Sequence, residues 1–202
     1  MKKFLLTLAP ICALALLSFN VGEPLAIGSK LPEAKFPMMD ISTGYNITIK
    51  EAAKSNGVLV MFSSNGCTDV IKNITRTKEI AAYAKANDIG FIMINSNEAQ
   101  RDGADSYEAM KVFYEQEKYT WSYVLDAKSV LANAFGATRT PECFLFNSSL
   151  SLVYHGAIDD SPADATLVST KYLKDAMDVM LTGKEVKPAT SNVVGCAIAT
   201  VH

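Results

Sequence analysis

The chain has 202 residues and a formal net charge of −2, and its 49% hydrophobic and 20% charged content is that of an ordinary globular protein. This composition excludes wholesale disorder and a collagen-like fibre. The near balance of 19 basic and 21 acidic residues gives no electrostatic footprint for nucleic acid. No CxxC, CxxH or HxxxH spacing occurs, which argues against a cysteine-rich zinc site. The four cysteines lie far apart, at Cys12, Cys67, Cys143 and Cys196.

The first 22 residues have the pattern of an export signal. Two lysines precede an apolar stretch of sixteen residues, Phe4 to Phe19, which has the charge and length of a secretory signal peptide. A membrane-spanning helix needs roughly 20 apolar residues, and Pro10 interrupts this stretch. We predict a signal peptide over residues 1–22, with an uncleaved anchor as the alternative, and a periplasmic or otherwise exported location, where disulfides persist. Removal of the signal would also remove Cys12.

From residue 28 onward the chain has the pattern of one domain in which strands and helices alternate. Residues 46–49 alternate like a short edge strand. Residues 57–62 form a continuous apolar run after a glycine, which favours a strand buried on both faces of a sheet. A polar cluster follows this run. A helix is then expected over 68–87, and residues 91–95 indicate a second buried strand.

The second half of the chain continues this alternation and contains a hairpin. Residues 105–116 are typical of a helix, with Val112 among the side chains expected to face inward. Residues 142–146 and 151–156 indicate two strands joined by a turn. The remaining expected elements are a short strand over 123–125, a helix over 129–135 closed by Gly136, a helix over 169–181 and an irregular tail over 184–202. This order predicts an α/β fold with a central mixed sheet and helices on both faces.

The sharpest local feature is Cys67, which lies one residue before the first long helix and just after a buried strand. Free backbone N–H groups and the positive end of the helix dipole favour a thiolate at such a position. The polar neighbours Ser64, Asn65, Thr68 and Asp69 indicate an exposed turn. A reactive cysteine is therefore one interpretation, and a small buried apolar cysteine is the other.

A second feature is the segment 137–142, in which Thr140 and Pro141 precede a buried strand. Proline is suited to a strand start because it has no N–H to donate to a ladder. The sequence pattern by itself leaves the cis or trans state of the Thr140–Pro141 bond open.

The order strand, cysteine turn, helix, strand, proline-led strand, hairpin and helix resembles the thioredoxin fold. It is more closely similar to the redoxin group of exported bacterial thioredoxin-like proteins, related to alkyl hydroperoxide reductase and thiol-specific antioxidant. The resemblance rests on VLVMFSSNGC (58–67), FIMINSNEAQRD (91–102), FGATRTPECFLFN (135–147), LVYHGAIDD (152–160) and VVGCAIA (193–199). It implies a cis proline, Pro141, opposite the reactive Cys67. It also implies thiol–disulfide or peroxide chemistry.

The chain departs from this group at the cysteine turn. Close relatives carry a CxxC segment, and here the four positions read Ser64-Asn65-Gly66-Cys67, so that Ser64 replaces the first cysteine. The other alignment, to the WCxxC thioredoxins, puts Val70 in the second position. Only one cysteine remains in either register, so exchange within a CxxC pair is excluded.

Three hypotheses remain open at this point. In the first, Ser64 and Cys67 act like the Thr-x-x-Cys of peroxiredoxins, and Arg139 holds a peroxide against the thiolate. In the second, Cys67 forms mixed disulfides, and Cys196 resolves them if the tail folds back over the site. In the third, the chain keeps a peptide-binding groove beside Pro141 but has lost redox turnover, and it acts as a binding module.

The sequence contains no Gly-rich phosphate loop and no metal-spaced cluster, so we expect no cofactor and no metal. The expected partners are protein thiols and disulfides or peroxide, together with an external thiol reductant. We expect neither nucleic acid binding nor stable membrane insertion after signal removal. Four further residues are interpreted as structural, namely Cys143, His155, Asp159 and Trp121. The prediction is therefore a thioredoxin-like domain over 28–202 whose thiol chemistry rests on a single active-site cysteine.

Overall fold

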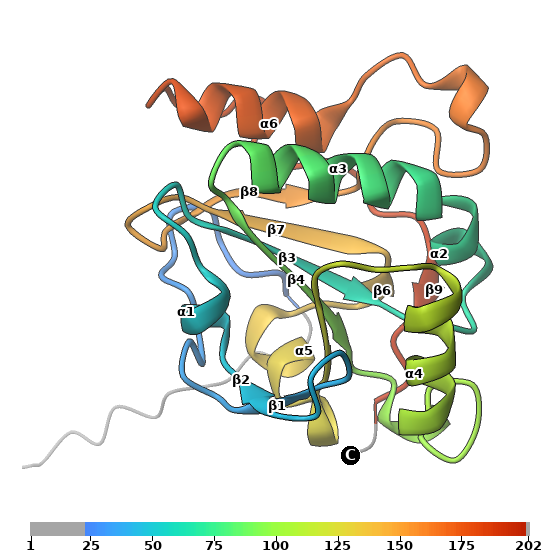
Figure 1. Cartoon of the computed structure of the whole chain (residues 1–202). Helices are drawn as coiled ribbons and strands as arrows, with labels where there is room; N and C mark the ends of the chain where they lie inside the picture. Colours follow the sequence, from blue (N-terminus) through green and yellow to red (C-terminus); the bar gives the residue numbers. More distant parts are fainter. Residues whose placement is uncertain (1–22, 201–202) are drawn as a thin grey trace, which may run out of the picture.

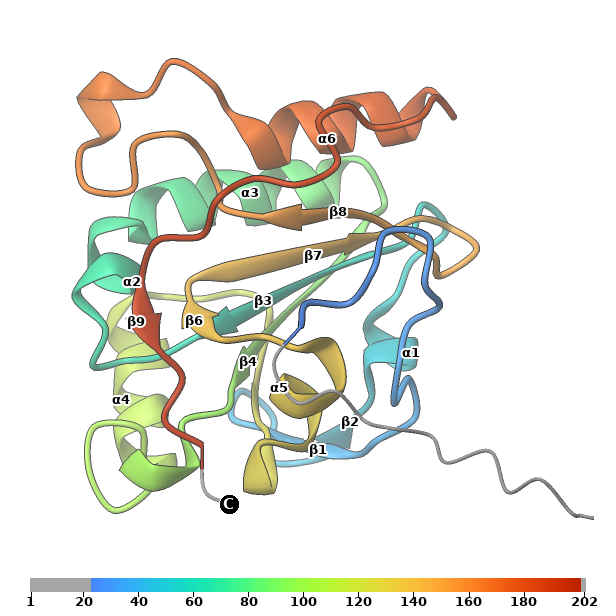
Figure 2. The same cartoon turned by 180° about the vertical axis from the view of Figure 1, so that it is seen from behind.

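A seven-stranded mixed sheet forms the centre of the computed structural model, which describes residues 23–200 (Figures 1 and 2). The predicted signal peptide over 1–22 lies outside the described residues. The strands follow the order β2-β1-β5-β4-β3-β7-β8. Their bounds are β1 Met38–Asp40, β2 Asn46–Ile47, β3 Val58–Ser63, β4 Gly90–Asn95, β5 Ser122–Leu125, β7 Glu142–Phe146 and β8 Leu152–Gly156.

The middle of the sheet is parallel and both of its ends are antiparallel. β3 pairs with β4 and β4 pairs with β5 in parallel, whereas β7 pairs antiparallel with β3 and with its hairpin partner β8. At the other edge, β1 pairs antiparallel with β5 and with β2. All six residues of β3 are buried, as expected for a central strand that is covered on both faces. This arrangement confirms the predicted α/β fold with a mixed sheet.

The side chains of β3 alternate between two core clusters, one on each face of the sheet. Met61 packs on one face with residues of α3 and α6, and Val60 packs on the other face with residues of α1 and α5. Figure 1 shows these two helix pairs on opposite sides of the sheet. The helices are α1 Ile49–Ala52, α2 Thr68–Lys72, α3 Ile74–Ala86, α4 Tyr107–Gln116, α5 Val130–Phe135 and α6 Tyr172–Leu181, with 3-10 turns at Glu98–Gln100, Ala127–Ser129 and Ala165–Leu167.

The long helix predicted over 68–87 is two helices, α2 and α3, which are separated at Asn73. The side-chain amide of Asn73 donates hydrogen bonds to the carbonyl oxygens of Asp69, at 2.7 Å, and Pro162, at 3.1 Å. Pro162 is 89 positions away in the sequence. The sequence pattern around Asn73 therefore could not predict this contact, which lies where the two helices are separated.

The helix α4 shows where the predicted inward face was wrong. Val112 is 51% exposed, whereas Met110 is fully buried. Residues two positions apart on a helix point to nearly opposite sides, so both could not face the core. The first turn begins after Ser106, whose hydroxyl oxygen accepts a hydrogen bond from the N–H of Ala109 at 3.2 Å.

Three other elements differ from the prediction. The edge strand predicted over 46–49 ends at residue 47, because Thr48 is the N-cap of α1 and forms a capping box with Glu51. The last helix begins at Tyr172 rather than at 169. The tail predicted as irregular contains β9, Cys196–Ala197, which pairs antiparallel with β6, Arg139–Thr140.

The C-terminal tail crosses the molecule to reach this pairing partner. Figure 2 shows the tail running from α6 to a position beside β6 and α2. Strand pairing over such a distance in the chain leaves no local periodicity in either segment, which is why the sequence pattern missed it. Between residues 23 and 200, none of the helices has the length and apolar character needed to cross a membrane.

Candidate functional site

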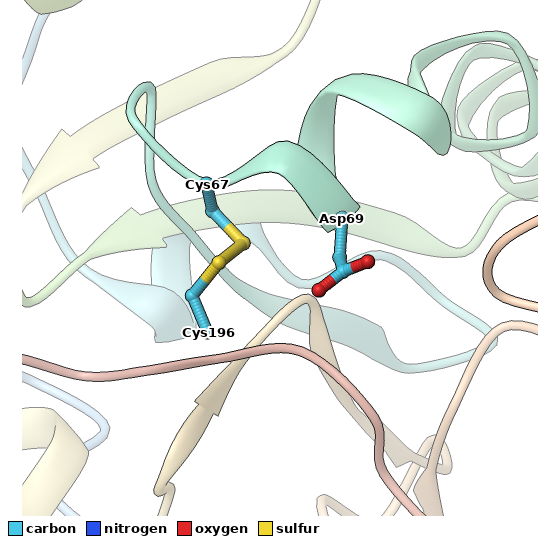
Figure 3. A group of neighbouring side chains, drawn as sticks. All are labelled: Cys67, Asp69 and Cys196. Carbon is cyan, nitrogen blue, oxygen red and sulfur yellow. A yellow bond between two sulfur atoms is a disulfide. The ribbon is translucent and has the colours of Figure 1, made fainter.

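Cys67 lies directly before α2 and forms a disulfide with Cys196 of β9 (Figure 3). The two Cα atoms are 5.8 Å apart although 129 positions separate them in the sequence. Cys67 is only 1% exposed, whereas Cys196 is partly exposed. The sequence predicted a single active-site cysteine, whereas in the structure Cys67 is bonded to Cys196.

The segment that leads into β7 packs against this disulfide. The carbonyl oxygen of Thr140 is 3.2 Å from Cys67 Sγ, and Thr140 is also the residue that pairs with Cys196 in the β6–β9 ladder. The Thr140–Pro141 peptide bond is cis. The structure thus brings three of the predicted site residues together, namely Cys67, Pro141 and Cys196.

The residues on either side of Cys196 form what we call the C-terminal strap, residues 195–199. The strap is held along β6 and the loop after β4 through its own backbone groups. Ile198 N donates to Thr138 O at 2.9 Å, Ala199 N donates to Asn97 Oδ1 at 2.8 Å, Ala99 N donates to Ala199 O at 2.9 Å, and Arg139 Nη1 donates to Gly195 O at 3.0 Å. Each of these contacts fixes the position of the strap without using a strap side chain.

A buried polar cluster centred on Asp105 supports the cysteine turn. The carboxylate of Asp105 accepts hydrogen bonds from Ser64 Oγ at 2.8 Å, from Asn65 N at 2.8 Å and from Asn95 Nδ2 at 2.7 Å. Arg101 Nη1 donates to Asn95 Oδ1 at 2.8 Å and to the Asp105 carbonyl at 2.9 Å. These contacts tie the turn to the end of β4. Sequence reasoning missed this cluster, although Asn95 and Arg101 fall in one of the segments that carry the family resemblance.

Ser64 and Arg139, which were expected beside the Cys67 sulfur in the peroxide hypothesis, make their hydrogen bonds elsewhere. The Ser64 hydroxyl donates to Asp105, and the guanidinium of Arg139 donates to the strap carbonyl of Gly195. In the structure, Arg139 therefore holds the strap and Ser64 holds the turn.

Glu142 fixes the backbone of β6 and was not singled out from the sequence. Glu142 is 1% exposed, and its Oε2 accepts hydrogen bonds from the N–H groups of Thr138, at 2.8 Å, and Arg139, at 2.9 Å. Its Oε1 lies 2.7 Å from Nε2 of His155. The interpretation of His155 as a strand histidine with a satisfied ring agrees with this contact.

The other cysteine among the described residues is not available for the chemistry of the pair. Cys143 is fully buried in β7, and burial raises the pKa of its thiol far above the usual range. This agrees with its interpretation as a core residue. Asp159 and Trp121 are also structural, since the Asp159 carboxylate forms an ion pair with Arg76 at 2.8 Å, and the Trp121 ring stacks on Tyr119.

The side chain of Asp69 lies beside the disulfide, as Figure 3 shows. One carboxylate oxygen of Asp69 and the two sulfur atoms of Cys67 and Cys196 all lie within 4.8 Å of one another. These three groups are the ones in the described part of the chain that could together hold a metal ion. The disulfide uses both sulfurs, so the arrangement in this structure is a disulfide with an adjacent carboxylate.

The chain belongs to the Redoxin family, whose model matches residues 26–169. Its fold is thioredoxin-like, and the class of protein is a thiol redox protein of that family. Among curated proteins, none matches the sequence.

Solved structures resemble the chain over most of its length. An uncharacterized conserved protein from Geobacillus kaustophilus is 28% identical, with a TM-score of 0.79 over 86% of this chain and 91% of that one. A hypothetical protein from Sinorhizobium meliloti 1021 is 29% identical, with a TM-score of 0.80 over 89% and 97% of the two chains. Peroxidoxin BcpB from Mycobacterium tuberculosis is 12% identical, with a TM-score of 0.57 over 78% and 96%, and this likeness concerns the fold alone.

Proposed function

We propose that the protein is an exported thiol–disulfide exchange protein in which Cys67 is the nucleophile and Cys196 resolves the mixed disulfide. The observation that carries this proposal is the Cys67–Cys196 disulfide, formed between a helix start and a strap from the far end of the chain. The pair replaces the CxxC pair that the sequence lacks, since the second sulfur comes from the tail rather than from the same turn.

The exposure of the two cysteines suggests the order of reduction. An external thiolate reaches Cys196 more readily than Cys67, because Cys196 is partly exposed and Cys67 is only 1% exposed. Attack there breaks the Cys67–Cys196 bond, and the Cys67 sulfur leaves with the electron pair as a thiolate. A second thiol of the reductant then displaces the first sulfur from Cys196, so that the reductant is oxidised and both cysteines are reduced.

Substrate reduction begins at the other cysteine of the pair, Cys67. The Cys67 thiolate attacks one sulfur of a substrate disulfide, and the other substrate sulfur leaves as a thiolate that takes a proton from water. The Cys196 thiolate then attacks the Cys67 sulfur, which releases the second substrate thiol and restores the Cys67–Cys196 disulfide. Two electrons pass from the protein to the substrate in each cycle.

Two features support export as the location in which this cycle runs. The apolar segment after the two N-terminal lysines has the pattern of a secretory signal. A disulfide that stays closed between reactions also suits an oxidising compartment better than the cytosol.

Peroxide reduction is less well supported than exchange with disulfides. Ser64 and Arg139, the residues that would hold a peroxide, donate to Asp105 and Gly195 instead. The binding-module hypothesis gives the Cys67–Cys196 pair no redox role, and we therefore place it second to exchange.

The test is catalysed reduction of bis(2-hydroxyethyl) disulfide with dithiothreitol as the reductant. We expect turnover by the wild type and loss of turnover in Cys67→Ser. Cys196→Ser, mixed with the disulfide in the absence of dithiothreitol, should stop at a mixed disulfide on Cys67. Cys143→Ala is the matched control and keeps wild-type turnover. Equal rates for the wild type and Cys67→Ser would overturn the proposal. Faster consumption of hydrogen peroxide than of the disulfide would favour the peroxide hypothesis instead.

A further inference from the structure

We infer that Cys67 reacts with extended partner segments in which a glycine directly precedes the cysteine, because β6 leaves no room for a side chain at that position. The C-terminal strap of the protein itself occupies β6 in the disulfide form. The inference rests on the proposed function and names the substrate class for the same cysteine pair.

The first reason is that the strap is bound as a strand, through its backbone. Thr140 pairs with Cys196 and Arg139 pairs with Ala197 in the antiparallel ladder. Ile198 N donates to Thr138 O on the same side. Any extended segment offers the same N–H and C=O groups, so β6 recognises a strand rather than a particular side chain.

The second reason is the position of Gly195. A Cβ at this residue would lie 2.1 Å from the carbonyl oxygen of Thr140, 2.8 Å from its carbonyl carbon and 3.3 Å from the nitrogen of Pro141. All three are backbone atoms of the ladder and the cis peptide unit, so they cannot swing aside as a side chain would. The φ of Gly195 is not in the left-handed region. Glycine is therefore needed here for space and not for backbone conformation.

The third reason concerns the residues on either side of this Gly-Cys pair. The side chain of Ile198, two positions after Cys196, is partly buried and packs against the core cluster that contains Val60 and Ala137. Val194, directly before Gly195, is 52% exposed, so packing does not restrict the residue at that position. Ala197, between Cys196 and Ile198, is exposed. The site therefore selects a segment with glycine, then cysteine, then any residue, then an apolar residue.

Because the strap occupies β6, it competes with the partner segment for binding to this strand. In the oxidised protein the disulfide holds the strap on β6, and reduction of that bond lets it exchange. A partner segment that carries a disulfide then lies on β6 with its cysteine sulfur facing Cys67. The Cys67 thiolate forms a bond to that sulfur, the second sulfur of the partner leaves as a thiolate, and Cys196 afterwards displaces the partner as described above.

The test uses the full chain with Cys196→Ser, so that the reaction stops at the mixed disulfide. The probe is the peptide Asn-Val-Val-Gly-Cys-Ala-Ile-Ala, the sequence of residues 192–199, with its cysteine activated as the thionitrobenzoate disulfide. A matched peptide has alanine in place of glycine. Release of thionitrobenzoate is followed by absorbance, and mass spectrometry identifies Cys67 as the site of attachment. The same two peptides react with 2-mercaptoethanol as the reference for intrinsic reactivity.

We expect the protein to react at least about tenfold faster with the glycine peptide than with the alanine peptide, because the added Cβ has no room. The two peptides should react equally with 2-mercaptoethanol. Equal rates with the protein would overturn the docking inference and leave the proposed exchange function standing. Release from neither peptide would overturn both.

A second measurement keeps the inference testable if the Cys196→Ser chain does not fold. In the protein with both cysteines, Gly195→Ala should shift the dithiothreitol equilibrium of the Cys67–Cys196 bond toward reduction by at least about tenfold. Gly103→Ala is the matched control, since the nearest atom to its Cβ lies at 3.7 Å, and it should leave the equilibrium unchanged. An unshifted equilibrium in Gly195→Ala would overturn the inference.

Discussion

Opening the Cys67–Cys196 disulfide should lower the stability of the folded chain by a large and calculable amount. The bond closes a loop of 129 positions, which is most of the described domain. The chain-entropy relation gives about 5 kcal/mol for a loop of this length, and native disulfides contribute about 2–5 kcal/mol in practice. A domain of this size changes its melting temperature by about 2–4 °C per kcal/mol. We therefore predict that Cys196→Ser melts about 5–20 °C below the wild type.

The assay is thermal unfolding followed by circular dichroism, with and without dithiothreitol. Reductant should lower the melting temperature of the wild type to that of Cys196→Ser and should not change that of the variant. Cys143→Ala serves as the control for a cysteine outside the pair and should keep its sensitivity to reductant. A wild-type melting temperature that does not respond to reductant would refute the reasoning, because the strap would then not be held by this bond.

Three further outcomes follow from the charges in the fold. Asp69→Asn should speed alkylation of reduced Cys67 about three- to fivefold, because a carboxylate this close opposes a thiolate by about 1 kcal/mol in water. An unchanged rate would contradict an effect of the Asp69 charge on the Cys67 thiolate. Burial raises the pKa of Asp126 above its ordinary 3.8. As pH rises past 3.8, this carboxyl group therefore loses its proton in the unfolded chain before it does so in the folded chain. The Asp126 carboxyl group should therefore lower the free energy of unfolding over that window. Asp126→Asn should remove this contribution, which is measured as the difference between wild type and variant in denaturant titrations at several pH values. Arg76→Ala should cost about 3–5 kcal/mol in the same titrations, because it leaves the buried Asp159 carboxylate unpaired; a cost below about 1 kcal/mol, as for an exposed pair, would contradict this.

The core of the fold could be predicted from the sequence because its signal is local. Continuous apolar runs such as 57–62 and 91–95 indicate strands that are covered on both faces, and both lie in the centre of the sheet. The break at Asn73 could not be predicted, because it coincides with a contact to Pro162, far along the chain. Elements held by distant partners leave no periodicity to detect.

The candidate site divides in the same way. Cys67 and Pro141 stood out because a cysteine before a helix and a proline before a buried strand are local patterns. The pairing of β9 with β6 and the burial of Glu142 against His155 depend on residues that meet only in the folded chain. The positions of Ser64 and Arg139 differ from the peroxide hypothesis for the same reason, since Asp105 and Gly195 were not visible as their partners.

The central claim is that Cys67 and Cys196 form one reversible two-electron pair. The most direct measurement equilibrates the full chain in dithiothreitol buffers of graded potential, traps free thiols by alkylation, and counts and locates them by mass spectrometry. The account predicts that two thiols appear together in a single transition, at Cys67 and Cys196, while Cys143 is unmodified throughout in the folded chain. Independent appearance of the two thiols, or a disulfide that includes Cys143, would contradict it.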